Sequence, residues 1–184
     1  MYKFSVLEAG LDEPAVWELQ NFLLSKAEEL FGIKDPAKKI YQPIFRPGQP
    51  HIINTPNYDG AFASLSENAS IYWPTTLYEL AHETVHLLNP IVGHTNYLEE
   101  GFAVLFSVDM ARKSTDTPQK PDCPFYNEAW SLVCRLSDNP YEAATAIRRE
   151  FGSLGAANAV KMAKIFPNVA VSTIQKLCSV CDFT

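Results

Sequence analysis

The sequence predicts an α+β fold, with a small antiparallel or mixed sheet in its N-terminal part and a helical C-terminal half. Two observations predict this class. Candidate strands occur only before Trp73, whereas helical spacing of apolar residues dominates from Thr76 onward. The chain has 184 residues, of which 47% are apolar, which suits one domain with a sizeable core. We therefore expect a single domain over 1–184, with a sheet and the helices that carry the site in 1–113 and a helical subdomain in 125–184.

The first elements are a strand over Tyr2–Leu7 and an amphipathic helix that follows it. Asp12 is a typical N-cap, and Pro14 suits the first turn of a helix. Apolar residues then recur at helical spacing until Gly32, which is typical of a helix end. This helix is expected to pack on the core and to carry no chemistry.

Residues 36–56 contain five of the 13 prolines. Proline lacks the amide donor that a central strand needs, so Lys39–Tyr41 and His51–Ile53 are expected to be edge strands or loop. Ala61–Leu65 and Ala69–Trp73 are then predicted to be two strands joined by a turn. Either of them could be a sheet edge that pairs with an extended peptide, or an ordinary sheet strand.

Two helices are predicted in the middle of the chain. Thr76 and Glu79 form a capping box that would start a helix ending near Asn89, because Pro90 forbids continuation. Asn96 and Glu99 form a similar cap for a second helix, which ends near residue 112. A proline-rich linker covers 114–124, and further helices are expected near 125–137, 141–151, 154–166 and 172–181.

The charge balance restricts the class of partner. There are 15 basic and 21 acidic residues, giving a net charge of −6. Nucleic acids and anionic membranes need clustered Lys and Arg, so neither is expected as the main partner. No transmembrane segment or signal peptide is evident, which predicts a cytoplasmic protein, although export by a non-classical route would leave the same pattern. The oligomeric state is left open.

The four cysteines are expected to be mostly buried thiols. Cys178 and Cys181 form a C-x-x-C pair, but no second pair of matching spacing accompanies them. Cys134 lies in an apolar helical stretch and is expected to pack as a small hydrophobic residue. A disulfide and a second metal site are the less favoured alternatives.

One motif points to chemistry. His82-Glu83-Thr84-Val85-His86 is an H-E-x-x-H sequence on a predicted helix, so both histidines face the same side, one turn apart. Two neutral imidazoles at this spacing can bind one Zn²⁺. Zinc lowers the pKa of a bound water to about 7, and Glu83 is placed to take its proton as general base. The alternative is a helix whose two histidines are satisfied by buried hydrogen bonds.

A third ligand is expected downstream, in Tyr97-Leu98-Glu99-Glu100-Gly101-Phe102-Ala103. With the H-E-x-x-H sequence, this segment resembles the gluzincin metallopeptidases, the clan of thermolysin and the zinc aminopeptidases. Aminopeptidase-like members place a glutamate ligand in a Trp-Leu-x-Glu-Gly-Phe-Ala setting. The resemblance, which covers about residues 74–107, implies a zincin-like fold, a peptide or protein substrate, and His82, His86 and Glu100 as zinc ligands.

The number of residues between the second histidine and the glutamate indicates which kind of gluzincin the chain resembles. Thirteen residues separate His86 from Glu100, fewer than in the aminopeptidases, which favours a minimal gluzincin. The pattern Glu100-x-x-Ala103-x-x-Phe106 is also similar to that of small intracellular regulators that cut phage-type repressors, although their spacing to the glutamate is generally longer.

Capping independently favours Glu100 over Glu99. Glu99 stands at the third helical position after Asn96, where its side chain can fold back on the cap. His94 is a rival ligand, but the glycine and histidine that the metzincin pattern requires after the second histidine are absent, so a solvated loop histidine is expected. His51 has no evident partner.

The oxyanion of the transition state needs a hydrogen-bond donor. In gluzincins this donor is usually a Tyr or His from the downstream helical region, and Tyr126 and Tyr141 are the candidates, with His94 a further possibility.

The main hypothesis is a zinc-dependent peptidase. The first alternative is a non-catalytic regulatory or interaction module that keeps zinc to fix its fold. A metal-free helical interaction protein is the second. Substrate and cleavage specificity, including exo- against endopeptidase action, are not given by the sequence.

Overall fold

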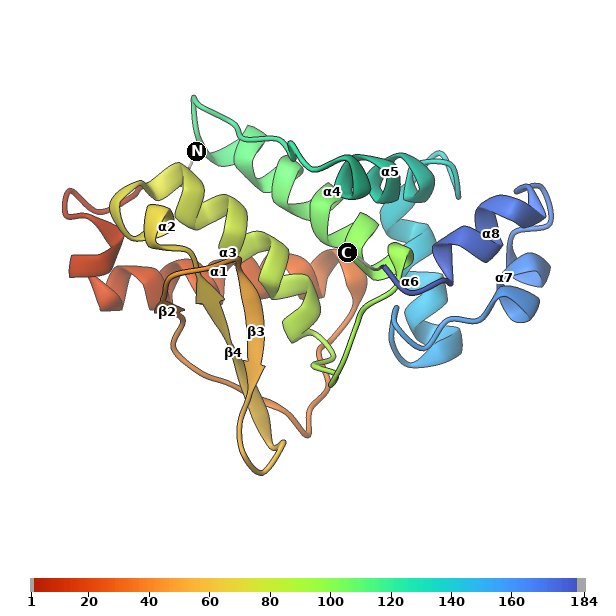
Figure 1. Cartoon of the computed structure of the whole chain (residues 1–184), viewed down its shortest axis with the longest axis horizontal. Helices are drawn as coiled ribbons and strands as arrows, with labels where there is room; N and C mark the ends of the chain where they lie inside the picture. The colour runs from red at the N-terminus through yellow and green to blue at the C-terminus, as the bar shows by residue number, and fades with distance from the viewer. Residues whose placement is uncertain (1, 182–184) are drawn as a thin grey trace. The chain divides into compact units, whose positions relative to one another are not determined.

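The computed structural model describes residues 2–181, and within this range it contains eight α-helices, four strands and one 3-10 helix (Figure 1). The chain folds into two compact units. The first holds the chain up to Glu29, Ile33–Val92 and Phe106–Lys120; the second holds Leu30–Gly32, Gly93–Leu105 and the described residues from Pro121 on. The predicted combination of a small sheet with a mainly helical chain is confirmed.

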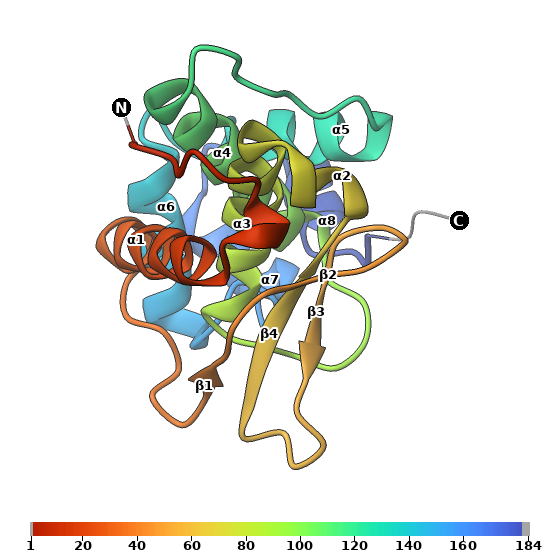
Figure 2. The same ribbon diagram turned by 90° about the vertical axis from the view of Figure 1, so that its left-hand side faces the viewer.

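The sheet belongs to the first unit and has β4 (Gly60–Leu65) at its centre. β3 (His51–Asn54) pairs antiparallel with β4, and the two strands lie side by side in both views (Figure 2). β1 (Lys39–Ile40) and β2 (Ile44–Phe45) pair with β4 in parallel. Ala61 and Ser64 each pair with β3 and with one of these short strands, so β1 and β2 share the edge opposite β3.

The sheet is therefore mixed, as predicted, and the proline-flanked segments are edge strands. The expectation that Ala61–Leu65 could be a free edge is wrong, because β4 is paired on both sides. A strand with a neighbouring strand on each side has no free edge with which an added peptide could pair.

Helix α1 (Glu13–Phe31) agrees with its sequence signals. The Asp12 carboxylate accepts a hydrogen bond from the Ala15 amide at 3.1 Å, which satisfies a donor of the first turn. Gly32 follows the helix with a φ of 91°, a conformation that favours glycine. The inward face consists of fully buried apolar side chains at helical spacing: Val16, Leu19, Leu23 and Ala27.

Two predicted strands are wrong. Residues 2–7 form no strand, and the first element is a 3-10 helix, η1 (Ala9–Leu11). Residues 67–71 form helix α2 (Glu67–Ile71) instead of the second strand of a hairpin. Ser66 explains the second error, because its hydroxyl accepts from the Ala69 amide at 3.3 Å and so caps a helix where a turn was expected.

The Thr76–Glu79 capping box is also wrong. Helix α3 (Trp73–Leu87) begins three residues before Thr76, with Pro74 in its first turn. The Thr76 hydroxyl donates to the Ala69 carbonyl at 2.6 Å. Glu79 instead accepts from the amide and the hydroxyl of Ser66, at 2.8 and 2.6 Å. Burial raises the pKa of Glu79, although these two hydrogen bonds act in the opposite direction.

Helix α4 (Tyr97–Ser114) extends through both units, and its first half belongs to the second unit. The Asn96 side chain accepts from the Glu99 amide at 2.9 Å, so the predicted N-cap is confirmed. Helices α5 (Pro124–Val133), α6 (Pro140–Phe151), α7 (Ala159–Ile165) and α8 (Val171–Leu177) follow, and α7 and α8 pack side by side (Figure 1).

Two close contacts lie within the second unit. Buried Arg148 donates to the carbonyls of Phe31 at 2.8 Å and Gly32 at 2.5 Å, which satisfies the C-terminal end of α1. At Gly101, an added Cβ would lie 2.4 Å from the Ala129 carbonyl oxygen, so this glycine lets α5 approach the backbone of α4.

None of the helices found in residues 2–181 has both the length and the apolar composition needed to cross a bilayer.

Candidate metal centre

The last turns of α3 present His82 and His86 on one helical face. Both side chains are buried, with 8% and 5% of their surface exposed. Thr84 lies about 200° around the helix from each of them. Its hydroxyl donates to the Leu80 carbonyl at 2.6 Å and accepts from the Gln20 amide on α1 at 2.9 Å. The face of α3 opposite the two imidazoles is thus bonded to α1.

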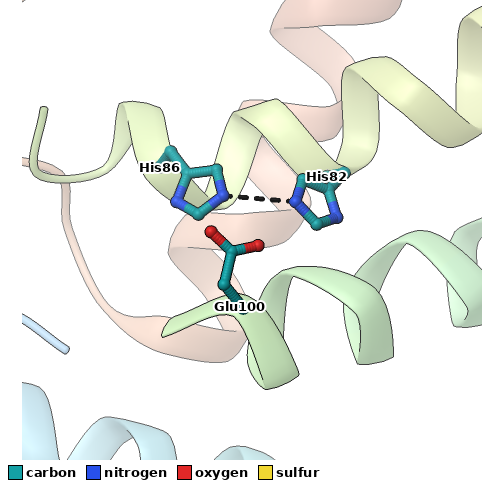
Figure 3. A group of neighbouring side chains, drawn as sticks. All are labelled: His82, His86 and Glu100. Carbon is teal, nitrogen blue, oxygen red and sulfur yellow. Dashed lines mark hydrogen bonds between the residues drawn. The ribbon is translucent and has the colours of Figure 1, made fainter. Parts of the chain in front are cut away.

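The two imidazoles turn the same nitrogen toward each other. Their Nε2 atoms lie 3.3 Å apart, and the ring centroids are 5.1 Å apart at an interplanar angle of 59° (Figure 3). Two nitrogen ligands at the usual Zn–N distance and a tetrahedral angle are also about 3.3 Å apart. The pair therefore already has the separation that two ligands of one tetrahedral ion require.

Glu100 completes a group of three. One ligand atom from each of His82, His86 and Glu100 lies within 4.8 Å of the others, and Glu100 is buried with 5% exposure. Figure 3 shows the Glu100 carboxylate, from the first turn of α4, directed toward the two rings. Glu99 is not part of the group, and its backbone amide donates to the Asn96 side chain that caps α4. Such a group could bind a metal ion.

The group has three members, and no fourth His, Cys, Asp or Glu of residues 2–181 joins it. A structural zinc site usually has four protein ligands, whereas a catalytic one has three and keeps a position for water. Glu83 is buried, 3% exposed, and follows His82 in the helix without belonging to the group. It can therefore act as a base without being a ligand.

The carboxylate of Glu100 is held from its own end of α4. The Thr95 hydroxyl donates a hydrogen bond to Glu100 Oε1. An ionised carboxylate only accepts, so the hydroxyl must be the donor. Sequence reasoning missed Thr95, because a threonine immediately before an N-cap gives no signal of its own. It also missed the packing role of Gly101, although a glycine inside a helical pattern is a visible signal.

The other candidate residues have ordinary surroundings. His94 is exposed in the loop before α4, and His51 is exposed on β3 with Nδ1 2.9 Å from the Gln49 carbonyl oxygen. Tyr141 is half-buried and packs edge-on against Phe31, with ring centroids 5.3 Å apart. Tyr126 is half-buried on α5. These positions leave the choice of oxyanion donor open among His94, Tyr126 and Tyr141.

No disulfide joins the four cysteines, all of which lie in the part of the chain that the structure describes. Cys181 is buried, and burial followed by the nearby Glu100 charge raises the pKa of its thiol to about 12. Burial also raises the pKa of Cys178. Thiol–disulfide exchange requires a thiolate, so these raised pKa values disfavour a redox role for the C-x-x-C pair at neutral pH. The expectation of mostly buried thiols is wrong, because only Cys181 of the four is buried; Cys134, at the C-cap of α5, is exposed.

Comparisons of the chain with protein-family models, with curated proteins and with solved structures find no match. The chemistry must therefore be argued from the site itself.

Proposed function

We propose that this protein is a zinc-dependent peptidase of gluzincin type, with His82, His86 and Glu100 as metal ligands and Glu83 as general base. The observation that supports the proposal is the buried group of two imidazoles and one carboxylate, with its Nε2 atoms 3.3 Å apart. The H-E-x-x-H sequence adds a fourth residue, a carboxylate that lies next to the group in the helix without joining it.

The donor set fits zinc better than the common alternatives. Imidazole nitrogen is a preferred ligand of zinc and of other transition metals, whereas magnesium and calcium take oxygen ligands. Two His and one Glu match a known catalytic zinc composition, with one position left for water. The three side chains are buried and close together, so binding would replace water around them with little rearrangement.

Each residue has a separate task in this proposal. When bound, zinc would act as a Lewis acid on a water molecule and on the carbonyl of the scissile peptide. Glu83 accepts a proton from the water and returns it to the nitrogen of the leaving amine. His82 and His86 would present Nε2 to the ion. A donor among His94, Tyr126 and Tyr141 would stabilise the developing oxyanion.

The alternative is a regulatory or protein-interaction module that binds zinc without catalysis. The two readings share the three ligands and differ in Glu83, which has a task only in the peptidase. A metal-free interaction protein is the third reading; in it, the two buried imidazoles and the buried carboxylate would be satisfied by hydrogen bonds within the chain.

The experiment combines metal analysis with peptide cleavage. The purified chain is loaded with zinc, its metal content is measured by mass spectrometry, and cleavage of a mixed peptide library is followed. We expect one zinc per chain and defined cleavage products. Glu83→Gln should lower the cleavage rate by about 10²–10⁴ while zinc stays bound. The matched control is Glu67→Gln, the same change on the exposed first turn of α2, which should alter neither quantity.

The possible results distinguish the peptidase from the two alternative functions. Zinc uptake without cleavage by the wild type would favour the non-catalytic module. Full cleavage by Glu83→Gln would refute its assignment as base. A folded chain that takes up no divalent metal would refute the metal centre and leave the interaction protein.

A further inference from the structure

The direction of the Glu100 side chain depends on a residue outside its helix. Thr95 precedes the Asn96 N-cap, and its hydroxyl donates to Glu100 Oε1. The carboxylate has two oxygens, and this hydrogen bond occupies one of them. The hydrogen bond thus restricts rotation of the carboxylate.

Thr95 itself is fixed by the last described residues of the chain. The Cys181 amide donates to the Thr95 carbonyl at 2.8 Å, and the Tyr97 amide donates to the Ser179 carbonyl at 3.1 Å. Asn96 and Val180 are opposite each other in an antiparallel bridge. The segment Ser179–Cys181 therefore pairs with Thr95–Tyr97 like two short strands.

Two further contacts stabilise the residues around Thr95. The ammonium group of Lys176 at the end of α8 lies 3.8 Å from the ring centroid of Tyr97, the first residue of α4. Buried Asn96 donates to the carbonyls of Leu154 and Gly155, both at 3.3 Å. The backbone on which Thr95 depends is thus held from three separate parts of the second unit.

We propose that Thr95 is a positioning residue for the metal centre: it holds Glu100 so that the carboxylate ligates the ion through one oxygen only. This inference rests on the proposed metal site and deepens it. Hydrogen bonds from the surroundings to metal-ligating side chains fix their orientation, and their loss typically weakens metal binding 10–100-fold. Thr95 touches neither the ion nor a substrate in this role, and acts only through Glu100.

The test compares two substitutions at position 95. Thr95→Val keeps the shape and removes the hydroxyl, whereas Thr95→Ser keeps the hydroxyl. Zinc affinity is measured by competition with a chromogenic chelator, and the coordination of Co²⁺ is followed by its visible absorption spectrum. We expect Thr95→Val to bind zinc about 10–100-fold more weakly with an altered Co²⁺ spectrum, and Thr95→Ser to restore both.

The control is Thr115→Val, the same change just beyond the other end of α4. The Thr115 hydroxyl accepts from the Thr117 amide at 2.9 Å, so this variant also loses a hydrogen bond. It should leave zinc affinity and the Co²⁺ spectrum unchanged. If Thr95→Val and Thr115→Val lower the melting temperature equally and neither changes the metal measurements, Thr95 is only structural and the inference is overturned.

A second measurement decides the case in which Thr95→Val does not fold. In a crystal structure of the zinc-loaded wild type, Glu100 must bind the ion through one oxygen while the other accepts from Thr95. Ligation through both oxygens, or a Thr95 hydroxyl turned away, would overturn the inference while leaving the proposed function intact. A wild type that binds no metal would overturn both.

Discussion

Helices α3 and α4 both supply residues to the metal group, but they hold them in different ways. His82 and His86 lie in a helix in which every residue from Thr76 to Leu87 except Tyr78 and Glu79 is buried, and the opposite face is bonded to α1. Glu100 lies in the first turn of its helix. The direction of its side chain depends on the Asn96 cap, on the Thr95 hydroxyl and on the segment Ser179–Cys181, which pairs with the backbone around Thr95. The positions of the two histidines thus follow from local helical periodicity, whereas the direction of the Glu100 carboxylate also depends on contacts with residues far away in the sequence.

Gly101→Ala should give the largest change in the free energy of unfolding, because it disturbs the packing of α5 on α4. Helix propensity alone predicts stabilisation by about 1 kcal/mol. The added Cβ would lie 2.4 Å from the Ala129 carbonyl oxygen and 2.6 Å from Val133 Cγ1, so α5 must move. We expect net destabilisation by about 1–3 kcal/mol, measured by urea unfolding. A more stable variant would show that the close approach of α5 is not required.

Thr84→Val should separate stability from metal binding on the α3 side. It removes the acceptor of the Gln20 amide, whose Oε1 already has no partner among residues 2–181. An unsatisfied buried amide costs about 1–3 kcal/mol. Zinc affinity of the folded protein should stay unchanged, because Thr84 faces away from the histidines.

The control for Thr84→Val is the double variant Gln20→Met/Thr84→Val. Replacing both partners by apolar groups of similar shape should recover most of the lost stability in the same urea titration. If the single change at Thr84 weakened zinc binding as strongly as Thr95→Val, the two helices would not differ in the way that the structure indicates.

The same difference explains how much the sequence could predict. Asp12, Gly32 and Asn96 act within their own turn of chain, and the helix ends that they predict are confirmed. The short segments 2–7 and 69–73 have strand-like composition, but composition alone does not decide between strand, loop and helix. Helix α2 instead depends on Ser66, which bonds Glu79 in the next helix.

In the metal group, too, the features set within one helical turn could be predicted from the sequence, whereas those set by distant residues could not. The spacing of His82 and His86 is a local property of a helix, and so is the preference for Glu100 over Glu99, because the first turn of α4 obeys its cap. The contribution of Thr95 required knowledge that Ser179–Cys181 pairs with the start of α4. No sequence pattern near either segment indicates that pairing.

Asn96→Ala should have the smallest effect on zinc binding and sharpen the comparison most, because it removes the cap acceptor and leaves the Thr95 hydroxyl in place. It also removes the hydrogen bonds that Asn96 donates to the carbonyls of Leu154 and Gly155. Loss of the acceptor for the Glu99 amide should cost about 0.5–2 kcal/mol. Since Thr95 and the paired segment remain, zinc should bind more weakly than to the wild type but more tightly than to Thr95→Val. Asn96→Ser keeps a cap acceptor but not the amide donor, so it should restore the cap's share of stability in urea unfolding and most of the affinity in chelator competition. If Asn96→Ala lost as much zinc affinity as Thr95→Val, the cap and not the Thr95 hydroxyl would determine where the carboxylate points.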